Sequence, residues 1–307
     1  MKTAVVNGST GSIGLALTNT LLKKGIKTYA VTFPGDKREE LLPDGVEIIH
    51  CDMREIEGLP ESINEKADAF FHLAWMGTIG PGRDDMMLQE ENIRCALNAV
   101  TAAKNCGCNV FVGVGSQAEH GRVSDGIIRP DTPCFPTNGY GIAKLCAGQM
   151  TRIVARQQGI RHIWTRILSV YGPNDSPLSV TSVIIDKLMN GEKPALTAGE
   201  QLWDYLYIDD AAEALYLMAE KGKDGAIYPL GSGQVQPLHK YFELIRDAID
   251  PELPIGVGEL PYPPNQVMRL QADIKCLADD TGFMPKIPFI EGIKRVIIEK
   301  KSKQNGE

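Results

Sequence analysis

Continuously apolar segments alternate with amphipathic segments through residue 168, and no other feature of the sequence restricts the fold as strongly. The apolar segments are rich in Val, Ile and Phe, as expected for strands that are covered on both faces. They lie at residues 3–6, 28–33, 46–50, 69–73, 110–114 and 162–168, and helical patterns separate them at 13–24, 86–104 and 138–158. Alternating strands and helices predict a parallel sheet with right-handed crossovers, which is a doubly wound α/β fold.

The alternation ends near Tyr171, where proline and glycine become frequent. We therefore expect residues 1–170 to form the main domain. Residues 171–307 are expected to form mainly a smaller lobe, with elements that return to the main sheet.

The composition excludes several classes of protein. The formal net charge is −7, and dense basic sequence occurs only at the extreme C-terminus, so a nucleic-acid partner is not expected. No apolar run is long enough to cross a membrane, and the chain starts with a strand pattern rather than a secretion signal. The seven cysteines are odd in number and lack zinc-ligand spacing. This favours reduced thiols, no bound metal and a cytoplasmic location.

A glycine-rich turn follows the first predicted strand and opens the first predicted helix. Gly8, Gly11 and Gly14 stand three residues apart there. Such a turn lets the backbone approach a pyrophosphate, whose negative charge is stabilised by the N-terminus of the helix. Its place in the first strand–helix unit therefore predicts a dinucleotide cofactor bound by a Rossmann domain.

The segment after the second strand bears on the choice between NAD and NADP. An acidic residue at the end of this strand would bond the adenosine ribose hydroxyls and favour NAD. The strand ends at Phe33 without one, whereas Asp36 comes later and is followed by Lys37 and Arg38. The two cations suit a 2′-phosphate, so the sequence leans to NADP. Asp36 as the ribose ligand of NAD is the alternative.

Tyr140 and Lys144 are one helical turn apart, so the phenol and the ammonium share one face of a predicted helix. The ammonium is expected to lower the pKa of the phenol, which then takes or gives a proton at an alcohol or ketone. Ser116 lies at the end of the preceding strand, where its hydroxyl can bond the same substrate oxygen. Asn138 is the expected cap of the helix. Ser116, Tyr140 and Lys144 are therefore the predicted catalytic residues of an oxidoreductase.

The order of these motifs resembles the extended short-chain dehydrogenases of the NAD-dependent epimerase/dehydratase family. The resemblance implies a nicotinamide cofactor, a nucleotide-linked sugar as substrate, and a homodimer formed through the helices at 86–104 and 138–158. The residues that it implies for the cofactor are Gly8, Thr10, Gly11, Ser12, Ile13, Gly14, Asp52, Met53, Leu73, Ala74, Trp75, Asn92, Tyr140, Lys144 and Leu168. Those that it implies for the substrate are Ser116, Ser169 and Arg269.

Several positions depart from the family pattern where the sugar would bind. Ile167 and Ser169 stand where the family's Arg-Pro-x-Asn-Val-Tyr-Gly-Pro motif has proline and asparagine. Trp203 stands where an arginine often meets the nucleotide diphosphate. Arg269 matches a second arginine with that role. We expect it to hold the phosphates, because a planar guanidinium binds two oxygens at once.

Three reactions share this scaffold. Dehydration is disfavoured, because Ser116 is followed by Gln117 and Ala118 instead of the paired acids of the dehydratases, and Glu119 comes too late. The remaining reactions are 4-epimerisation with tightly held NAD and reduction of a 4-keto-6-deoxysugar with Tyr140 as proton donor. The missing ribose carboxylate favours the reductase, and the loop at 115–121 is similar to that of such reductases. A carbonyl reductase for a free ketone and a non-catalytic NADP-binding sensor or scaffold stay open as alternatives.

Overall fold

Seven parallel strands form the central sheet of the computed structural model, which describes residues 1–264 and 266–305. The order across the sheet is β12-β7-β5-β4-β1-β2-β3, so the doubly wound α/β fold predicted from the sequence is confirmed. The chain steps outward from β1 to β3 and then crosses to β4 on the other side of β1. Ligands of such sheets bind in the crevice that this reversal opens at the carboxyl ends of the strands. The strands are β1 (Thr3–Asn7), β2 (Lys27–Thr32), β3 (Glu47–His50), β4 (Ala69–His72), β5 (Val110–Ser116), β7 (Arg161–Ile167) and β12 (Ile227–Leu230).

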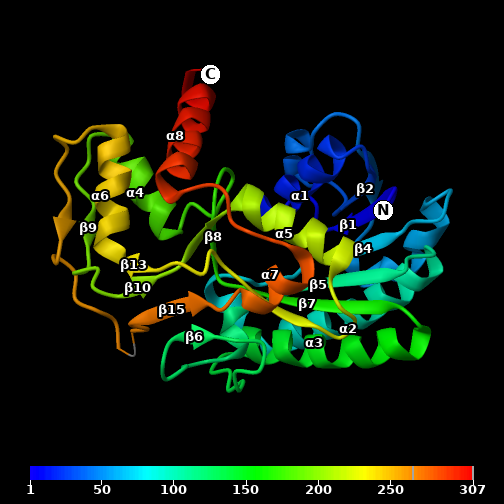
Figure 1. The fold of residues 1–307 in the computed structure, drawn as a ribbon. Coiled ribbons are helices and arrows are strands. Elements are labelled where there is room, and N and C mark those ends of the chain that lie inside the picture. The colour runs from blue at the N-terminus through cyan, green and yellow to red at the C-terminus, as the bar shows by residue number, and fades with distance from the viewer. Residues whose placement is uncertain (265, 306–307) are drawn as a thin grey trace.

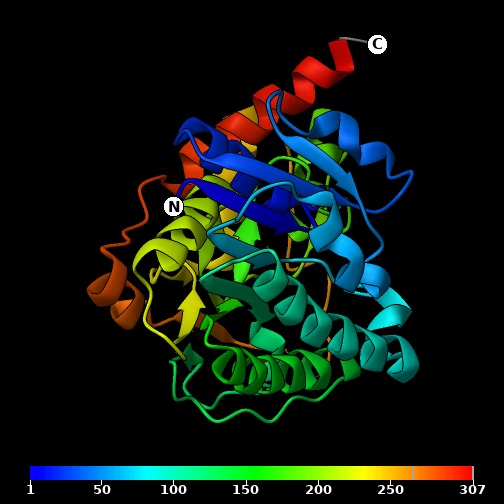
Figure 2. The same ribbon diagram turned by 90° about the vertical axis from the view of Figure 1, so that its right-hand side faces the viewer.

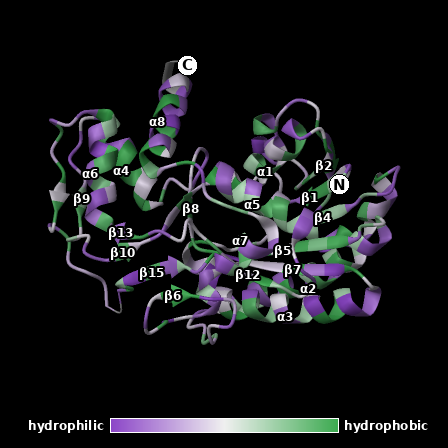
Figure 3. Ribbon diagram, in the orientation of Figure 1, coloured by the Kyte–Doolittle hydropathy of each residue, from purple (hydrophilic) through white to green (hydrophobic). Residues whose placement is uncertain are grey.

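Helices cover both faces of this sheet (Figures 1 and 2). The helices α1 (Ser12–Lys23) and α5 (Ile208–Lys221) pack together on one face, and α2 (Met86–Asn105) and α3 (Gly139–Gln158) on the other. Successive residues of a strand therefore enter different cores: Val5 and Phe70 lie in one, Val6 and Phe71 in the other. Each such side chain contributes about 1.5–3 kcal/mol through its burial. This two-sided burial explains why the strands read as continuously apolar, as the colouring of β4 and β5 in Figure 3 illustrates.

The ends of the strands differ slightly from those that hydropathy predicts. β5 continues two residues beyond the predicted end at Val114, because Ser116 still pairs with Ile167 of β7. Phe33, Leu73 and Leu168 were expected as strand ends and instead lie just after β2, β4 and β7. A hydrogen-bonded ladder extends as far as its partner strand allows, which side-chain hydropathy does not record.

The smaller lobe contains the helices α4 (Val180–Met189), α6 (Leu238–Ile249) and α8 (Phe289–Asn305). Its core unites residues from all three, including Ile184, Phe242 and Ile293. Its largest sheet has the order β13-β10-β15-β6. The short strands are β6 (Ile127–Ile128), β8 (Ser169–Tyr171), β9 (Ala195–Leu196), β10 (Leu202–Trp203), β11 (Tyr205–Tyr207), β13 (Gln236–Pro237), β14 (Gly256–Val257) and β15 (Arg269–Ala272).

The two parts of the fold exchange segments. β6 comes from the first half of the chain and pairs with β15 of the lobe. In the opposite direction, α5, β12 and α7 (Lys275–Thr281) return to the main sheet and its helical layer, as Figure 1 shows. Four 3-10 helices complete the described elements: η1 (Lys37–Leu41), η2 (Met53–Ser62), η3 (Gly80–Asp84) and η4 (Gln117–Glu119). Within the described residues, no helix combines the length and apolar character that crossing a membrane would require.

Candidate active site

The three glycines of the first turn have different structural roles. Gly8 adopts a φ of +85°, and a Cβ there would lie 2.5 Å from the backbone N of Ala74. A Cβ at Gly14 would lie 2.2 Å from the carbonyl oxygen of Gly8. Gly11 is exposed, and the nearest atom to a Cβ there is 3.4 Å away. Gly8 and Gly14 are thus required to pack the turn against β4 and α1, while Gly11 leaves open space above the turn.

The N-terminus of α1 is suited to an anion. Gly11 occupies the cap position and offers no side chain to bond the first backbone N–H groups of the helix. The first turn of α1 also contains no acidic residue. The free N–H groups and the positive end of the helix dipole are the features that bind a pyrophosphate.

A cleft of about 410 Å³ opens beside this turn, at the carboxyl ends of β1 to β4. Six of the residues implied for the cofactor line it: Gly8, Thr10, Asp52, Met53, Ala74 and Trp75. Residues outside the implied cofactor set complete the lining: Asn7, Val31, Thr32, Phe33, Cys51, Arg54 and Met76. The Phe33 side chain is 57% exposed here, which is high for an aromatic ring. A dinucleotide fits this combination of an open glycine, a free helix end and an apolar cleft.

The edge of the cleft beside β2 carries a carboxylate. The Thr10 hydroxyl donates a hydrogen bond of 2.7 Å to Asp36, and this bond lowers the pKa of the Asp36 carboxyl. Lys37 and Arg38 are both exposed, and the Arg38 guanidinium donates to the backbone carbonyl of Asn174 at 3.3 Å. Asp36 is therefore attached to the phosphate-binding turn, whereas Arg38 bonds a loop of the other lobe.

Asn92 on α2 acts on the cleft through a loop. Its amide accepts a hydrogen bond from the Met76 backbone N at 2.8 Å and donates one to the Met76 carbonyl at 2.9 Å. The side chain is completely buried. Both bonds fix the segment that follows β4, so Asn92 shapes the wall of the cleft from behind.

The other residues implied for the cofactor lie beside the cleft rather than in its lining. Ile13 packs into the core beneath α1. Leu73 donates its backbone N–H to Asn7. Leu168 is 9% exposed and joins the small core between the main sheet and the lobe. Ser12 lines a separate cavity together with Leu15 and Asn19 of α1.

The structure brings the three predicted catalytic residues together. Ser116 ends β5, and Tyr140 stands in the first turn of α3, where its phenol interacts with the Ser116 side chain. Asn138 caps this helix as predicted, because its side chain accepts a hydrogen bond of 2.8 Å from the backbone N of Gly141. The Lys144 Nζ lies 5.9 Å from the centre of the Tyr140 ring.

The electrostatics of the pair differ from the expectation. Lys144 is 3% exposed, its Nζ donates to the Val114 carbonyl at 2.7 Å, and it rests 3.7 Å from the centre of the Trp75 ring. Burial lowers the pKa of Lys144 to about 7. Burial also raises the pKa of Tyr140, against the opposing effects of Ser116 and Arg83. Lys144 does not contribute the expected lowering, because the ammonium bonds the backbone of β5 instead of the phenol.

Comparison with known proteins agrees with this geometry. The model of the NAD dependent epimerase/dehydratase family matches residues 4–231. The chain belongs to this family. Its members are NAD-dependent enzymes, so the prediction that the protein is an enzyme of this kind is confirmed.

Relatives of known name support the assignment. A putative UDP-glucose 4-epimerase from Methanocaldococcus jannaschii is 25% identical over 95% of this chain and 96% of its own length. A human dTDP-D-glucose 4,6-dehydratase is 28% identical, over 64% of this chain and 58% of its own length. A solved UDP-N-acetylglucosamine 4-epimerase from Methanobrevibacter ruminantium M1 shares the fold with a TM-score of 0.88 and 24% identity, over 98% of this chain and 99% of that one.

The serine loop of this family member carries a buried ion pair. Glu119 and Arg166 are 1% and 3% exposed, and Arg166 Nε lies 2.7 Å from a Glu119 oxygen. The other Glu119 oxygen accepts from the Trp164 indole at 3.0 Å and from the backbone N of Ser116 at 2.9 Å. Both oxygens of this carboxylate thus hold the loop in place.

Two departures from the family pattern are in direct contact. The Trp203 indole N–H donates a hydrogen bond of 2.8 Å to the Ser169 hydroxyl. The Trp203 carbonyl accepts from the Tyr241 hydroxyl at 2.9 Å, so the residue is fixed from both ends. Arg269 lies on β15 beside β10, where its guanidinium donates to Gln271 at 2.7 Å.

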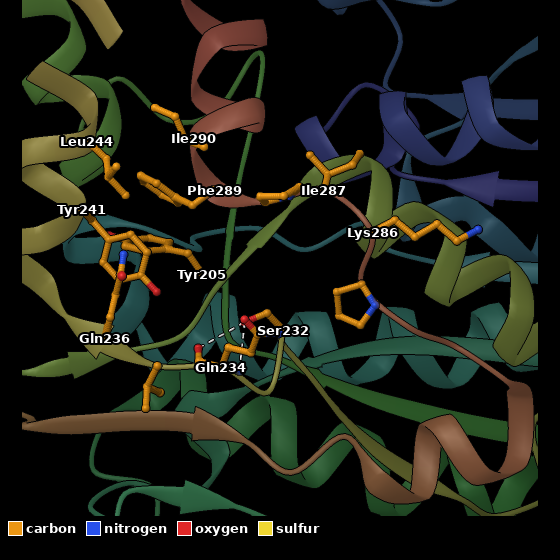
Figure 4. A pocket seen from close by; sticks show the side chains of 13 residues that line it. Tyr205, Ser232, Gln234, Gln236, Tyr241, Leu244, Lys286, Ile287, Phe289 and Ile290 are labelled. Carbon is orange, nitrogen blue, oxygen red and sulfur yellow. Dashed lines mark hydrogen bonds between the residues drawn. The ribbon is translucent and has the colours of Figure 1, made fainter. Parts of the chain in front are cut away.

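A second cavity of about 350 Å³ lies in the lobe (Figure 4). The rings of Tyr205, Tyr241 and Phe289 form one side, and Ser232 and Gln234 lie opposite. Among the described residues that line it, none was predicted for catalysis, cofactor or substrate. Ser116, Tyr140 and Lys144 do not line this cavity, but Trp75 of the cleft beside the glycine turn connects them to that cleft: its ring centre lies 3.7 Å from the Lys144 Nζ and 6.3 Å from the centre of the Tyr140 ring.

Sequence reasoning missed two residues that shape the catalytic surroundings. The buried Gln89 amide donates to the carbonyls of Gly77 and Gly82 and holds the loop between β4 and α2. Arg83 in the same loop lies over the Tyr140 ring. Arg83 is the only basic residue between β4 and α2, a sequence signal that would have found it. Gln89 has no comparable signal.

Proposed function

We propose that the protein reduces a 4-keto-6-deoxysugar carried on a nucleoside diphosphate. The observation that carries this proposal is the meeting of Ser116 and Tyr140 at the end of β5, beside a cleft that suits a nicotinamide dinucleotide. Two hydroxyls at one point can bond a carbonyl oxygen, and the phenol can give it a proton.

The roles of the residues follow from their places. The bound cofactor would supply a hydride to the keto carbon. Ser116 would hold the keto oxygen, and Tyr140 would give that oxygen its proton. Lys144, between Trp75 of the cleft and Tyr140, would contact the cofactor ribose after leaving the Val114 carbonyl. The raised pKa of Tyr140 keeps the phenol protonated at neutral pH, as a proton donor requires.

The contacts of the Glu119 carboxylate favour reduction over dehydration. A dehydratase needs a carboxyl group that is free to move a proton on the substrate. Glu119 is held by Arg166, Trp164 and Ser116, so it serves the loop rather than the substrate. The similarity of the loop at 115–121 to that of 4-keto-6-deoxysugar reductases supports the same choice.

A 4-epimerase is the second candidate, and Asp36 favours it. A carboxylate bonded to Thr10 at the edge of the cleft suits a ribose with free hydroxyls and repels a 2′-phosphate. This arrangement supports NAD, the cofactor that an epimerase retains, against the lean to NADP from Lys37 and Arg38. The similarity to named 4-epimerases points the same way.

One experiment separates the two reactions. Purified protein is incubated with a nucleoside diphosphate 4-keto-6-deoxyhexose and either NADH or NADPH, and separately with UDP-glucose or UDP-N-acetylglucosamine alone. A reductase oxidises one equivalent of reduced cofactor for each keto sugar consumed. An epimerase converts its sugar with no net change in cofactor. Absence of both reactions over a panel of nucleotide sugars would contradict the proposal.

We also propose that the protein is a homodimer through α2 and α3. Apolar side chains on these helices are exposed in the single chain: Met87, Ile142, Met150 and Ile153 are 77%, 52%, 41% and 46% exposed. A surface of this kind is typical of a protein–protein interface. Light scattering of the purified protein should give twice the molar mass of one chain. The Ile153→Lys protein should give the molar mass of a single chain.

A further inference from the structure

Arg83 occupies a position next to the catalytic phenol that its hydrogen bonding does not explain. Its guanidinium carbon lies 4.3 Å from the centre of the Tyr140 ring. One of its N–H groups donates to the Thr78 carbonyl at 2.8 Å. Among residues 1–264 and 266–305, no carboxylate lies within ion-pair distance of it. Besides that hydrogen bond, the half-buried guanidinium has no counter-charge and is attracted to the face of the ring that it covers.

The loop that carries Arg83 is attached to the helix that carries Tyr140. The Asp84 carboxylate accepts a hydrogen bond of 2.8 Å from the backbone N of Gly139, the first residue of α3. A Cβ at Gly82 would lie 2.8 Å from the Cα of Gly77, so the loop closes tightly on itself. Gln89 bonds both ends of this closure. The place of the guanidinium over the ring is therefore fixed by contacts on both sides of it.

The charged groups around Tyr140 leave Arg83 as its nearest cation. The Lys144 Nζ is 5.9 Å from the ring centre, farther than the Arg83 guanidinium, and it bonds the Val114 carbonyl. Glu119 is neutralised by its ion pair with Arg166. Asp84 is directed to the start of α3. A phenol that gives up its proton becomes negative, and the guanidinium is then the charge best placed to stabilise it.

We propose that Arg83 is a positioning residue for Tyr140, which holds the phenol ring in place and stabilises the phenolate formed when the proton is given to the substrate. The proposal rests on the proposed role of Tyr140 as proton donor. Burial raises the pKa of Tyr140, whereas the Arg83 charge lowers it and so offsets part of the effect of burial. The covering of the ring by Arg83 and the linkage of the two elements through Asp84 are the geometric basis.

The test is a spectroscopic titration of Tyr140 that does not depend on turnover. The ultraviolet absorbance of phenolate is measured as a function of pH. The chain has nine tyrosines, so the curve of the same protein with Tyr140→Phe is subtracted to remove the absorbance of the other eight. Arg83→Gln removes the charge, and Arg83→Lys keeps it. Arg94→Gln on the exposed side of α2 is the control for loss of a surface arginine.

We expect Arg83→Gln to move the Tyr140 titration to higher pH and to reduce kcat/KM about 2- to 30-fold, the range of a cation over an aromatic ring. Arg83→Lys should recover part of both changes, and cofactor affinity should stay unchanged. Asp84→Asn, which weakens the attachment of the loop, should move the titration in the same direction by less. An unchanged titration in folded Arg83→Gln protein, or an equal shift in Arg94→Gln, would overturn the proposal. If no nucleotide sugar is turned over by the native protein, the proposed function fails, yet the titration still decides the role of Arg83.

Discussion

Glu119 and Arg166 form an ion pair of 2.7 Å in which both side chains are almost completely buried. The pair lies directly behind Ser116, whose backbone N–H donates to the same carboxylate. A buried pair of this kind stabilises little when intact, but removing one partner leaves an uncompensated charge in a medium of low polarity.

Glu119→Gln should therefore reduce the free energy of unfolding by about 3–5 kcal/mol, because Arg166 keeps its charge and loses its counter-ion. Urea unfolding followed by circular dichroism measures the change. Asp125→Asn, which breaks the exposed pair with Arg129, is the matched control and should cost at most about 1 kcal/mol. Equal effects of the two substitutions would contradict the role given to the buried pair.

Lys144 should make the stability of the protein depend on pH. Its pKa is about 7 in the folded protein against 10.5 as the ordinary value, so between these pH values the unfolded chain holds a proton that the folded one does not. Unfolding takes up that proton, and the free energy of unfolding therefore rises with pH across this window, by at most about 1.4 kcal/mol for each pH unit. Below pH 7 the full cost of the buried ammonium is present.

Lys144→Met tests this linkage. The variant should lose the rise between pH 7 and pH 10.5 and should gain most in stability over the native protein below pH 7. It should also lose cofactor affinity and activity, since the ammonium is expected to hold the ribose. Lys104→Met on the exposed side of α2 should leave the pH dependence as it is. Parallel pH profiles for native protein and Lys144→Met would show that Lys144 is not responsible.

Tyr140→Phe should lower kcat about 10²–10⁴-fold, because the ring keeps its packing but the proton donor is lost. Cofactor affinity, measured by calorimetry, should stay the same. Ser116→Ala should cost less in rate, since the proton source remains. It also removes the hydrogen bond that the Ser116 hydroxyl accepts from the backbone N of Ala118, so a loss of about 1 kcal/mol in stability is expected. A Tyr140→Phe protein that works at the native rate would refute the mechanism.

Gly11→Val should abolish dinucleotide binding while the protein stays folded. The backbone of Gly11, with φ −63° and ψ 156°, accepts any residue, and its Cβ would meet no atom of the protein closer than 3.4 Å. The side chain would occupy the place of the pyrophosphate. Gly14→Val is the comparison: its Cβ would lie 2.2 Å from the Gly8 carbonyl, so this variant should lose stability as well as binding. If calorimetry finds the native cofactor affinity in Gly11→Val, the pyrophosphate does not bind at this turn.

Asp36→Asn should change the choice of cofactor. Loss of the carboxylate that Thr10 bonds is expected to weaken NADH binding and to strengthen NADPH binding, with Lys37 then free to attract the 2′-phosphate. The attraction should fall with added salt, because Lys37 is exposed. Arg38→Gln should change the preference less, since Arg38 bonds Asn174. If the native protein prefers NADPH and Arg38→Gln abolishes this preference, the result would favour NADP as the cofactor, as Lys37 and Arg38 suggested from the sequence.

The local features of this protein were predictable from its sequence. Alternating apolar and amphipathic segments predicted the doubly wound sheet, because Val5 and Val6, or Phe70 and Phe71, each need an apolar environment on opposite faces. Asn138 predicted the start of α3, because a cap bonds an N–H group only three residues away. Such features depend on residues that are close together along the chain, so the sequence alone is enough to identify them.

The charges and contacts of the site were decided by the tertiary structure alone. Glu119 meets Arg166 across 47 positions, and Trp203 meets Ser169 across 34. Lys144 bonds the carbonyl of Val114 instead of the phenol, because the backbone of β5 passes within hydrogen-bond distance of its Nζ. The sequence names the residue types that can carry out catalysis, but the pKa of an ionisable group depends on its burial and on nearby charges. Segments far apart in the chain supply both, and only folding brings them together.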